Sequence, residues 1–298
     1  DQKVEEVSDE ELLILEYLSK TVLSGVRPQE LELLKLMLNH EEVSIEKLQG
    51  EVSAEFGYLL NMDGIQSTLN VLEGHFVSNE TEYQKYAQID ILKASENKSI
   101  QRAEGFAQKL NEKEFHKELK DIISVGLQRY KDKYIQNNNQ DVLFVLYEKY
   151  SRRDVSFLMD CGKDLSSTMY GMKKINDDVF IFVTYHKEKT EDDGKEYIDG
   201  KPDYADMFED NQIFCWDTQI GRGIDSSYTQ DVMKAYRKHS MVKKSDAETT
   251  FYYMGQFDIV EVKPAKKLDN KGKERDIAKF RVKMRHAVRD DLLQYLES

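Results

Sequence analysis

The sequence predicts an α+β protein in which a helical N-terminal domain, residues 1–140, precedes a strand-rich C-terminal domain, residues 141–298. Apolar residues recur at helical spacing before the polar tract at 136–140, and they alternate as in strands after it. Aromatic residues are sparse before this boundary, 10 of 140, and frequent after it, 21 of 158. The net charge changes there from −10 (16 basic, 26 acidic residues) to −3 (27 and 30).

Composition limits the class of protein. The 298 residues have a net charge of −13 and are 40% hydrophobic, which is enough for a substantial core and argues against disorder or a fibre. No apolar run approaches the 18 residues of a membrane span. The two cysteines are too few for a disulfide framework, and the acidic first stretch is unlike a secretory leader. We therefore expect a cytoplasmic protein, and the start at Asp1 suggests a segment of a longer chain.

Recognisable signals mark the helices of the N-terminal domain. Ser8 and Glu11 have the spacing of a capping box, and Gly25 is typical of a helix end. Pro28 suits the first turn of the next helix. Apolar spacing predicts further helices at 44–48, 62–72 and 111–134.

Two short helices followed by a strand-like tail are similar to a winged-helix unit, whose second helix can enter the major groove of DNA. Residues 62–74, however, carry no Lys or Arg, and a helix that reads the groove normally needs cations for phosphate contacts. We therefore expect this region to pack or connect rather than to read DNA.

Strands dominate the C-terminal domain. A short helix is predicted at 151–160 and a second at 228–238, with an acidic loop at 191–203. Strands are predicted at 169–175, 179–185, 212–218, 250–262 and 276–285. Mostly antiparallel strands with a few short helices predict a barrel-like α+β domain.

The last predicted strand alternates cations with apolar residues. The cations are Lys279, Arg281, Lys283 and Arg285, and the apolar residues are Phe280, Val282 and Met284. Alternate side chains point to opposite faces of a strand, so the cations share one face. Residues 222–289 hold 17 basic and 9 acidic residues, whereas 141–221 hold 10 and 18. This local excess is typical of a nucleic-acid backbone site, although an ordinary solvated sheet face gives the same pattern.

Two tyrosines next to predicted loops are candidates for stacking on a planar base. Tyr170 follows the small polar residues Ser167 and Thr168 and precedes a glycine, and Tyr185 ends an apolar strand. Stacking contributes about 1–3 kcal/mol per base, which offsets much of the few kcal/mol needed to extrude a nucleotide. A core position for each ring is the alternative interpretation.

No catalytic constellation is evident. The six histidines and two cysteines lack metal-ligand spacing, and there is no phosphate-binding GxxxxGK[ST] loop, so we expect neither zinc nor ATP in this segment. A nuclease-like pattern places Glu261 and Lys263 on one strand, with Asp246 and Asp258 upstream. A metal-dependent nuclease needs an acid pair and a lysine near the phosphate, but such a triplet is common by chance.

The C-terminal domain contains several characteristic blocks in one order, which include LYEKYSRRDV (146–155), STMYG (167–171), IFVTYHK (181–187), YADMF (204–208), FCWDTQ (214–219), VKKSD (242–246), FYYMG (251–255) and DDL (290–292). In these blocks and their order the domain resembles the C-terminal region of SauUSI-type, modification-dependent (type IV) restriction endonucleases. The blocks cover residues 147–296, and residues 8–135 look like the helical region that follows the helicase motor in these enzymes.

The resemblance implies a target-recognition region that follows a phospholipase-D-like nuclease and a superfamily 2 helicase. The family restricts DNA that contains 5-methylcytosine or 5-hydroxymethylcytosine, as in defence against phage. It further implies an SRA-like barrel with short helices, which would flip the modified base into an aromatic cage. The resemblance does not identify the residues of the cage. We expect Tyr170 and Tyr185 as stacking faces, Trp216 in reserve, Asp206 or Asp217 for the cytosine amino group, and Ser167 and Thr168 in the pocket. A turn or strand-end contact is the alternative interpretation of the two Asp residues. The implied phosphate contacts are Lys279, Arg281, Lys283, Arg285, Lys243 and Lys244.

Three functional hypotheses follow. The favoured one is binding of duplex DNA with a modified cytosine by a segment that is itself no enzyme and needs no cofactor. ATP and Mg²⁺ would serve only the full-length bacterial enzyme, whose helicase and nuclease domains would be the partners within one polypeptide. The alternatives are a metal-dependent nuclease centred on Glu261 and Lys263, and a regulatory module that docks on the motor without reading DNA.

Overall fold

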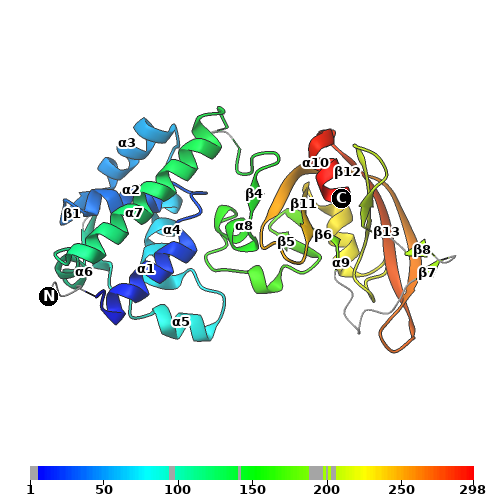
Figure 1. Ribbon diagram of the computed structural model, residues 1–298, viewed down its shortest axis with the longest axis horizontal. Coiled ribbons are helices and arrows are strands. Elements are labelled where there is room, and N and C mark those ends of the chain that lie inside the picture. The colour runs from blue at the N-terminus through cyan, green and yellow to red at the C-terminus, as the bar shows by residue number, and fades with distance from the viewer. Residues whose placement is uncertain (1–5, 94–97, 140–141, 188–196, 199–200, 203–205) are drawn as a thin grey trace. The chain divides into compact units, whose positions relative to one another are not determined.

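A computed structural model describes residues 6–93, 98–139, 142–187, 197–198, 201–202 and 206–298. The chain forms two units (Figure 1). The helical unit comprises residues 1–145 and 153–166, and the sheet unit comprises residues 146–152 and 167–298. The chain thus leaves the sheet unit after Arg152 and returns to it at Ser167. Within the described part of the chain, none of the helices combines the length and apolarity that a membrane crossing requires.

The helical unit begins at the predicted cap. Ser8 Oγ accepts from the Glu11 amide at 3.2 Å, and the Glu11 carboxylate accepts from the Ser8 amide at 2.9 Å. The elements are α1 (Asp9–Thr21), α2 (Gln29–Met37), β1 (Glu42–Ser44), α3 (Ile45–Phe56), α4 (Met62–Asn70), η1 (Val71–His75), α5 (Glu80–Tyr86), β2 (Leu92–Lys93), β3 (Ser99–Arg102), α6 (Glu104–Lys109), α7 (Lys113–Tyr130) and η2 (Lys131–Ile135).

The order of elements in this unit is that of a winged helix. A helix (α2), a strand (β1) and two helices (α3 and α4) lead to the hairpin β2–β3, and the antiparallel sheet has the order β1-β3-β2. Helix α4 occupies the place of the groove-reading helix. It contains no Lys or Arg, and its buried residues are Ile65 and Thr68.

Residues 153–166 pack on α4 and cover part of its polar side. Ser67 Oγ lies 2.5 Å from an oxygen of Asp160, and the Asn70 amide donates to the Gly162 carbonyl at 3.1 Å. Arg27 donates to both Ser67 and the Phe157 carbonyl. Helix α4 therefore has a packing role, as its lack of cations predicts.

The sheet unit consists of short helices and one large sheet. Its elements are β4 (Lys149–Tyr150), β5 (Met172–Ile175), β6 (Asp178–His186), β7 (Tyr197–Ile198), β8 (Lys201–Pro202), β9 (Met207–Phe208), β10 (Ile213–Asp217), α9 (Ser227–Lys234), β11 (Arg237–Ser245), β12 (Phe251–Leu268), β13 (Glu274–Met284) and α10 (Asp290–Glu297), while α8 (Arg152–Leu158) and η3 (Ser166–Thr168) mark the two crossings between units.

Eight strands form the large sheet in the order β5-β6-β11-β12-β13-β10-β9, and β4 pairs with β12. The pairs are antiparallel except β6 with β11, which is parallel. Strand β11 was not predicted, and the helix expected at 228–238 ends at Lys234. The sequence of β11, RKHSMVKKS, is too polar to show the alternation of a half-buried strand.

The α+β class is confirmed, but the expected barrel does not close. The described strands form an open path that ends at β5 and β9. Both ends nevertheless contribute to a single buried cluster, Met172 from β5 and Phe208 from β9, so the sheet curls around one core. Bulges at Ser240/Met241 and Ile259/Glu261 increase the local twist that this curling requires.

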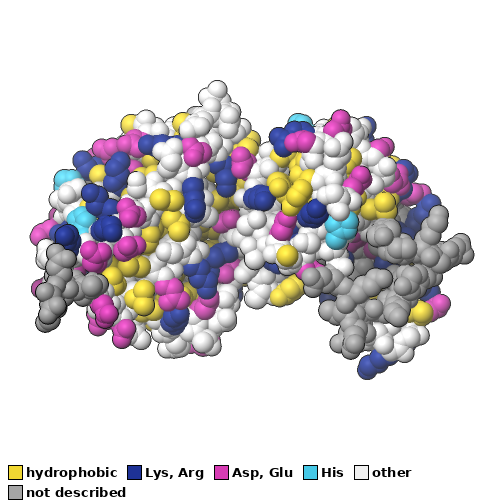
Figure 2. All heavy atoms as spheres, in the orientation of Figure 1, with side chains coloured by type: hydrophobic (Ala, Val, Ile, Leu, Met, Phe, Trp, Pro, Cys, Tyr) yellow, Lys and Arg dark blue, Asp and Glu magenta, His cyan; other side chains and the backbone are white. Residues whose placement is uncertain are grey.

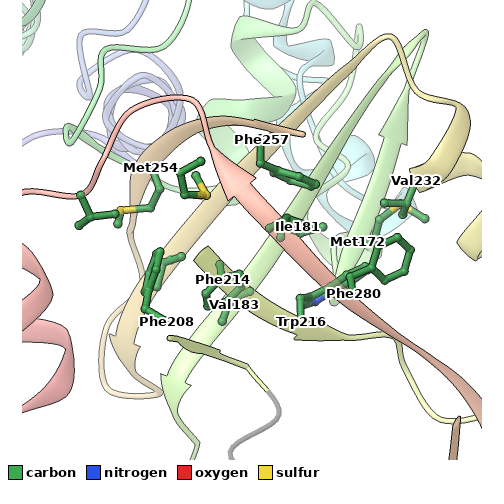
Figure 3. Packing of buried hydrophobic residues seen from close by; sticks show 14 of the residues in the cluster. Met172, Ile181, Val183, Phe208, Phe214, Trp216, Val232, Met254, Phe257 and Phe280 are labelled. Carbon is green, nitrogen blue, oxygen red and sulfur yellow. The ribbon is translucent and has the colours of Figure 1, made fainter. Parts of the chain in front are cut away.

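Aromatic and sulfur-containing side chains fill this core (Figure 3). Phe214 and Trp216 point inward from β10, Phe280 points inward from β13, and α9 and α10 contribute Val232 and Leu296. The ring centres of Trp216 and Phe280 are 5.3 Å apart. The pleat of neighbouring strands therefore sends one face of β10 and β13 into the core and leaves the other face outside.

Candidate nucleic-acid interface

The cation face on β13 forms as the alternation predicts. Phe280, Val282 and Met284 are buried, while Lys283 is exposed and Arg281 is half-buried. β13 is held between β12 and β10 by continuous antiparallel pairing. The alternation of the sequence thus places the cations on the face of the strand that is turned away from the core.

Carboxylates accompany these cations. Lys279 Nζ lies 3.1 Å from Asp217, and Arg281 binds Glu209 through two hydrogen bonds of 2.9 and 2.8 Å. Arg285 lies 3.2 Å from Asp258. Among the four, only Lys283 forms no ion pair with any residue that the structure describes. The face is therefore mixed in charge, because carboxylates from β10, β12 and the segment before β10 lie beside three of its four cations.

The pair of Arg281 with Glu209 affects the titration of the groups around it. The Arg281 guanidinium is the main cause that lowers the pKa of Glu209, with the Cys215 thiol as a second donor. Burial and the Glu209 carboxylate raise the pKa of Cys215 to about 12. Solvent-exposed ion pairs contribute only about 0–1 kcal/mol, so a phosphate can replace such a partner at small cost. On the face that Figure 2 shows, basic and acidic side chains are likewise interspersed over the described surface.

The lysines of β11 do not point to a DNA backbone. Lys243 is only 7% exposed, and its Nζ donates to the Glu248 carbonyl at 2.9 Å. Burial is the main cause that lowers the pKa of Lys243. Lys244 donates to Ser298 Oγ at 2.8 Å and lies over the Tyr295 ring. The prediction that Lys243 binds phosphate is therefore wrong, because the strand turns this side chain into the unit.

Tyr170 is the one predicted stacking residue whose ring is open to solvent, with 62% of the residue exposed. It lies between η3 and Gly171, whose φ of 71° is a conformation that favours glycine. The Tyr170 carbonyl accepts from Gln219 at 2.9 Å and from the Met172 amide at 2.8 Å. These contacts fix the backbone from which the exposed ring projects.

An arginine that the sequence analysis did not select lies beside this ring. The Arg152 guanidinium carbon is 5.5 Å from the centre of Tyr170 and 4.9 Å from the centre of Phe251. Arg152 Nε donates to the Met169 carbonyl at 2.8 Å, and desolvation lowers the pKa of Arg152. The sequence shows Arg152 only as the start of a helix, so no local signal pairs it with Tyr170.

Ser167 and Thr168 are exposed in η3, and the buried Met169 separates them from Tyr170. Tyr185 is half-buried and packs nearly parallel to Phe208, with ring centres 6.5 Å apart and an angle of 19°. Burial is the main cause that raises the pKa of Tyr185. Trp216 is only 2% exposed in the core and is not available to a base. The structure therefore does not assemble the expected cage of Tyr170, Tyr185 and Trp216.

The two candidate carboxylates stabilise the sheet unit. Asp206 accepts from the Asp217 amide at 3.0 Å and lies 3.1 Å from Lys187. Asp217 lies 3.0 Å from Lys267 and 3.1 Å from Lys279. Their side chains are 12% and 7% exposed. Both carboxylates thus have lysine partners inside the unit.

The two residues of the nuclease-like pattern, Glu261 and Lys263, have exposed side chains and form an ion pair with each other. Glu261 lies 3.0 Å from Lys263, next to the bulge at Ile259/Glu261. The described residues contain one group of three or more His, Cys, Asp or Glu side chains that could share a metal ion, and it lies in the helical unit at Glu32, Glu51 and Glu55. Glu261 belongs to no such group among the described residues.

Two sequence families match the chain. The family described as Domain of unknown function (DUF3427) matches residues 144–296, and Domain of unknown function (DUF8090) matches residues 1–132. No curated protein matches. The chain is similar at 11% identity and a TM-score of 0.30 to the sulfur-binding and SRA domains of ScoMcrA in complex with phosphorothioated DNA, over 93% of this chain and 94% of that one.

A second structure of ScoMcrA, a type IV phosphorothioation-dependent restriction endonuclease, is similar at the same identity and TM-score, over 93% of this chain and 66% of that one. The first family match spans more than half of the sequence and contains every predicted site residue. The chain belongs to the DUF3427 family.

Proposed function

We propose that the sheet unit binds duplex DNA and recognises a modified cytosine, with Tyr170 as the stacking surface. The observation that carries this proposal is the exposed Tyr170 ring beside the Arg152 guanidinium, in the same unit as the cation face of β13. An aromatic ring that a rigid backbone holds in solvent is a ready platform for an extruded base.

The platform has one open face. Arg152 occupies one side of the Tyr170 ring at 5.5 Å, so a base would stack on the other side. A single stack contributes about 1–3 kcal/mol, which is comparable to the few kcal/mol that extrusion costs. Phosphate contacts must supply the remaining affinity. A platform with one tyrosine replaces the two-tyrosine cage that the sequence suggests.

Ser167 and Thr168 are exposed residues that lie three and two positions before Tyr170 in the chain, and a hydroxyl can both donate and accept. We assign them, in place of Asp206 and Asp217, to the hydrogen-bonding edge of the base. One buried methyl group contributes about 0.8 kcal/mol, and a pocket rarely discriminates one methylene by more than roughly 3 kcal/mol. Preference for 5-methylcytosine or 5-hydroxymethylcytosine over cytosine is therefore expected in the range of tens to about two hundred fold.

Within a longer polypeptide, this segment would be the target-recognition region of a modification-dependent restriction enzyme. Helicase and nuclease domains elsewhere in that chain would supply ATP- and Mg²⁺-dependent chemistry. The segment itself would bind and would not cut. This arrangement is the one that the sequence blocks at 146–155 and 167–171 imply by resemblance.

Binding of residues 1–298 to matched duplexes tests the proposal. The duplexes carry cytosine, 5-methylcytosine or 5-hydroxymethylcytosine at one position, and a phosphorothioated duplex forms a fourth arm. We expect Tyr170→Ala to weaken binding of the preferred modified duplex by about tenfold or more, because about 1–3 kcal/mol of stacking is lost. Tyr170→Phe, which keeps the ring, should retain most of the affinity.

Tyr236 provides a matched control, since it is 79% exposed in the same unit and also lies over an arginine, Arg237, at 5.8 Å. Tyr236→Ala should bind as the wild type does. Equal binding of all duplexes would reduce the role to holding the DNA backbone. The absence of any DNA binding at moderate salt would overturn the proposal and favour docking on the motor.

A further inference from the structure

We propose that the end of the β12–β13 hairpin, residues 263–275, is an arm that lies in a groove of the DNA and binds its phosphates. We call this segment the basic ribbon. The inference rests on the proposed function and adds a second contact surface to it. The ribbon carries two acidic residues, Asp269 and Glu274, against six basic ones, which are Lys263, Lys266, Lys267, Lys271, Lys273 and Arg275.

The ribbon extends beyond the rest of the sheet. β10 pairs with β13 only as far as Asp217↔Lys279. The loop that follows β10 donates its last backbone hydrogen bonds to the carbonyls of Ala278 and Asp276 on β13. Beyond Asp276 the ladder of the described residues consists of β12 and β13 alone, and residues 270–276 are all exposed. In Figure 1 the turn between β12 and β13 projects past the neighbouring strands.

The turn at the tip is ordered by its own hydrogen bonds. One oxygen of Asp269 accepts from the amides of Lys271 and Lys273, each at 2.9 Å, and Gly272 has a φ of 76°. These backbone contacts are the main cause that lowers the pKa of Asp269. The Asp269 carboxylate is thus occupied by the turn, while the ammonium groups of Lys271 and Lys273 form no ion pair with any described residue. The tip therefore presents two exposed cations on an ordered turn.

Like charges face each other across the ribbon. In the register, Lys263 is opposite Lys279 and Lys267 is opposite Arg275. Like charges directly opposite one another destabilise a strand pair. Asp217 offsets part of this repulsion at the base, since it lies within 3.1 Å of both Lys267 and Lys279. Lys263 and Arg275 also have carboxylate neighbours, Glu261 at 3.0 Å and Asp269 at 3.7 Å. Ion pairs at the surface contribute only about 0–1 kcal/mol, so the phosphates of a nucleic acid can replace these partners at small cost.

The dimensions suit a DNA groove. A two-stranded ribbon fits the major groove, which is about 12 Å wide. The five steps from Lys263 to Leu268 extend about 17 Å at the usual rise of a strand, so the tip can reach into the groove while Lys279 stays at the sheet. Lys279 also begins the cation face of β13. The ribbon and that face thus follow one another along β13.

Charge removal at the tip tests the inference. The variant Lys266→Gln/Lys271→Gln/Lys273→Gln is compared with Lys113→Gln/Lys117→Gln/Lys120→Gln, which removes three exposed lysines from the helical unit and changes the net charge equally. Binding of residues 1–298 to the modified and unmodified duplexes is measured across a salt series. We expect the ribbon variant to lose affinity for both duplexes by the same factor, about tenfold or more at low salt, with a salt slope shallower by about 2–3.

The ratio of affinities for the two duplexes should stay at the wild-type value in the ribbon variant, and the helical-unit variant should bind as the wild type does. If the wild type discriminates between the duplexes and the ribbon variant binds like its control, the inference is overturned and the proposed function stands. If the wild type binds neither duplex, both fail together. The charge reversal Lys271→Glu/Lys273→Glu should lower affinity further, and unchanged binding would again overturn the inference.

Discussion

His239 on β11 is the centre of a buried hydrogen-bond chain. Its ring stacks on Phe180 with centres 4.4 Å apart. Nδ1 lies 2.8 Å from the Tyr253 hydroxyl, and Nε2 lies 2.9 Å from Asp178. A neutral ring satisfies both contacts, because Tyr253 donates to Nδ1 and Nε2–H donates to the carboxylate. Burial is the main cause that lowers the pKa of His239, against the opposing effect of Asp178.

This lowered pKa predicts a pH dependence of stability. The unfolded chain takes up a proton on His239 at a higher pH than the folded chain does. The stabilising contribution is therefore complete above the unfolded pKa of about 6.5 and is lost as the pH falls toward the folded pKa. We expect the wild-type Tm to fall between pH 7.5 and pH 5.5, and His239→Gln, although less stable at pH 7.5, to show a smaller fall.

Thermal unfolding followed by circular dichroism at the two pH values measures this difference. His40→Gln is the control, because His40 is exposed, and it should behave as the wild type does. An equal fall in Tm for the wild type and His239→Gln would show that His239 is not responsible.

At the scale of elements, two glycines allow the chain after α1 to lie against α7. Gly25 has a φ of 68°, and a Cβ there would lie 2.4 Å from the Gly126 carbonyl oxygen and 2.7 Å from the Arg129 Cβ. A Cβ on Gly126 would in turn lie 2.8 Å from Leu31. The glycine that the sequence marks as a helix end therefore also permits a close helix contact, although α1 itself ends at Thr21.

We expect Gly25→Ala to lower the free energy of unfolding of the helical unit by about 1–3 kcal/mol or more, because overpacking adds to the strain of a positive φ. Gly50 in α3 is the control, since a Cβ there meets nothing within 4 Å. Gly50→Ala should stabilise the helix by about 0.5–1 kcal/mol. Urea unfolding followed by circular dichroism measures both changes. If Gly25→Ala lowered the free energy of unfolding by less than the experimental scatter of the Gly50→Ala measurement, the result would contradict the close contact at Gly25.

At the scale of the whole molecule, the double crossing of the chain between units is the unusual feature. Residues 153–166 lie within the DUF3427 match but fold with the helical unit. Arg153 fixes this segment, because it binds Asp164 at 2.8 Å, Thr21 at 2.9 Å and the Phe76 carbonyl at 2.8 Å. Arg152, the preceding residue, belongs to the sheet unit and supports Tyr170.

We expect Arg153→Ala to destabilise the helical unit by about 3–5 kcal/mol, because it leaves Asp164, whose side chain is 5% exposed, as an uncompensated buried charge. Arg289→Ala is the control, since it breaks a pair with Asp291 in which both side chains are well exposed, and it should cost less than about 1 kcal/mol. Circular dichroism reports the helices, while fluorescence of Trp216, the single tryptophan, reports the sheet unit. If the unfolding transition that circular dichroism reports were the same for Arg153→Ala and for the control Arg289→Ala, the stabilising role of Arg153 would be refuted.

The sequence predicts those features that depend on neighbouring residues. The capping box at Ser8 is a local hydrogen-bond pattern, and the alternation on β13 follows from the pleat of any strand. Strand β11 and the outer half of β12 escape prediction because their sequences are polar. Long-range pairing with β6 and β13 holds them in the sheet.

The residues of the candidate site likewise fall into those that a local sequence signal predicts and those whose position depends on the fold. Tyr170 next to Gly171 is recognisable as a loop aromatic, because the small and glycine residues around it are a local signal. Trp216 and Lys243 have residue types equally suited to a DNA site, yet the structure buries both. Local residue patterns are therefore enough to predict the α+β class and the alternation of cations on β13, and to make Tyr170 a candidate. The exposure of Tyr170, the position of Arg152 beside it and the projection of the basic ribbon become evident only in the folded protein, because they depend on contacts between residues far apart in the chain.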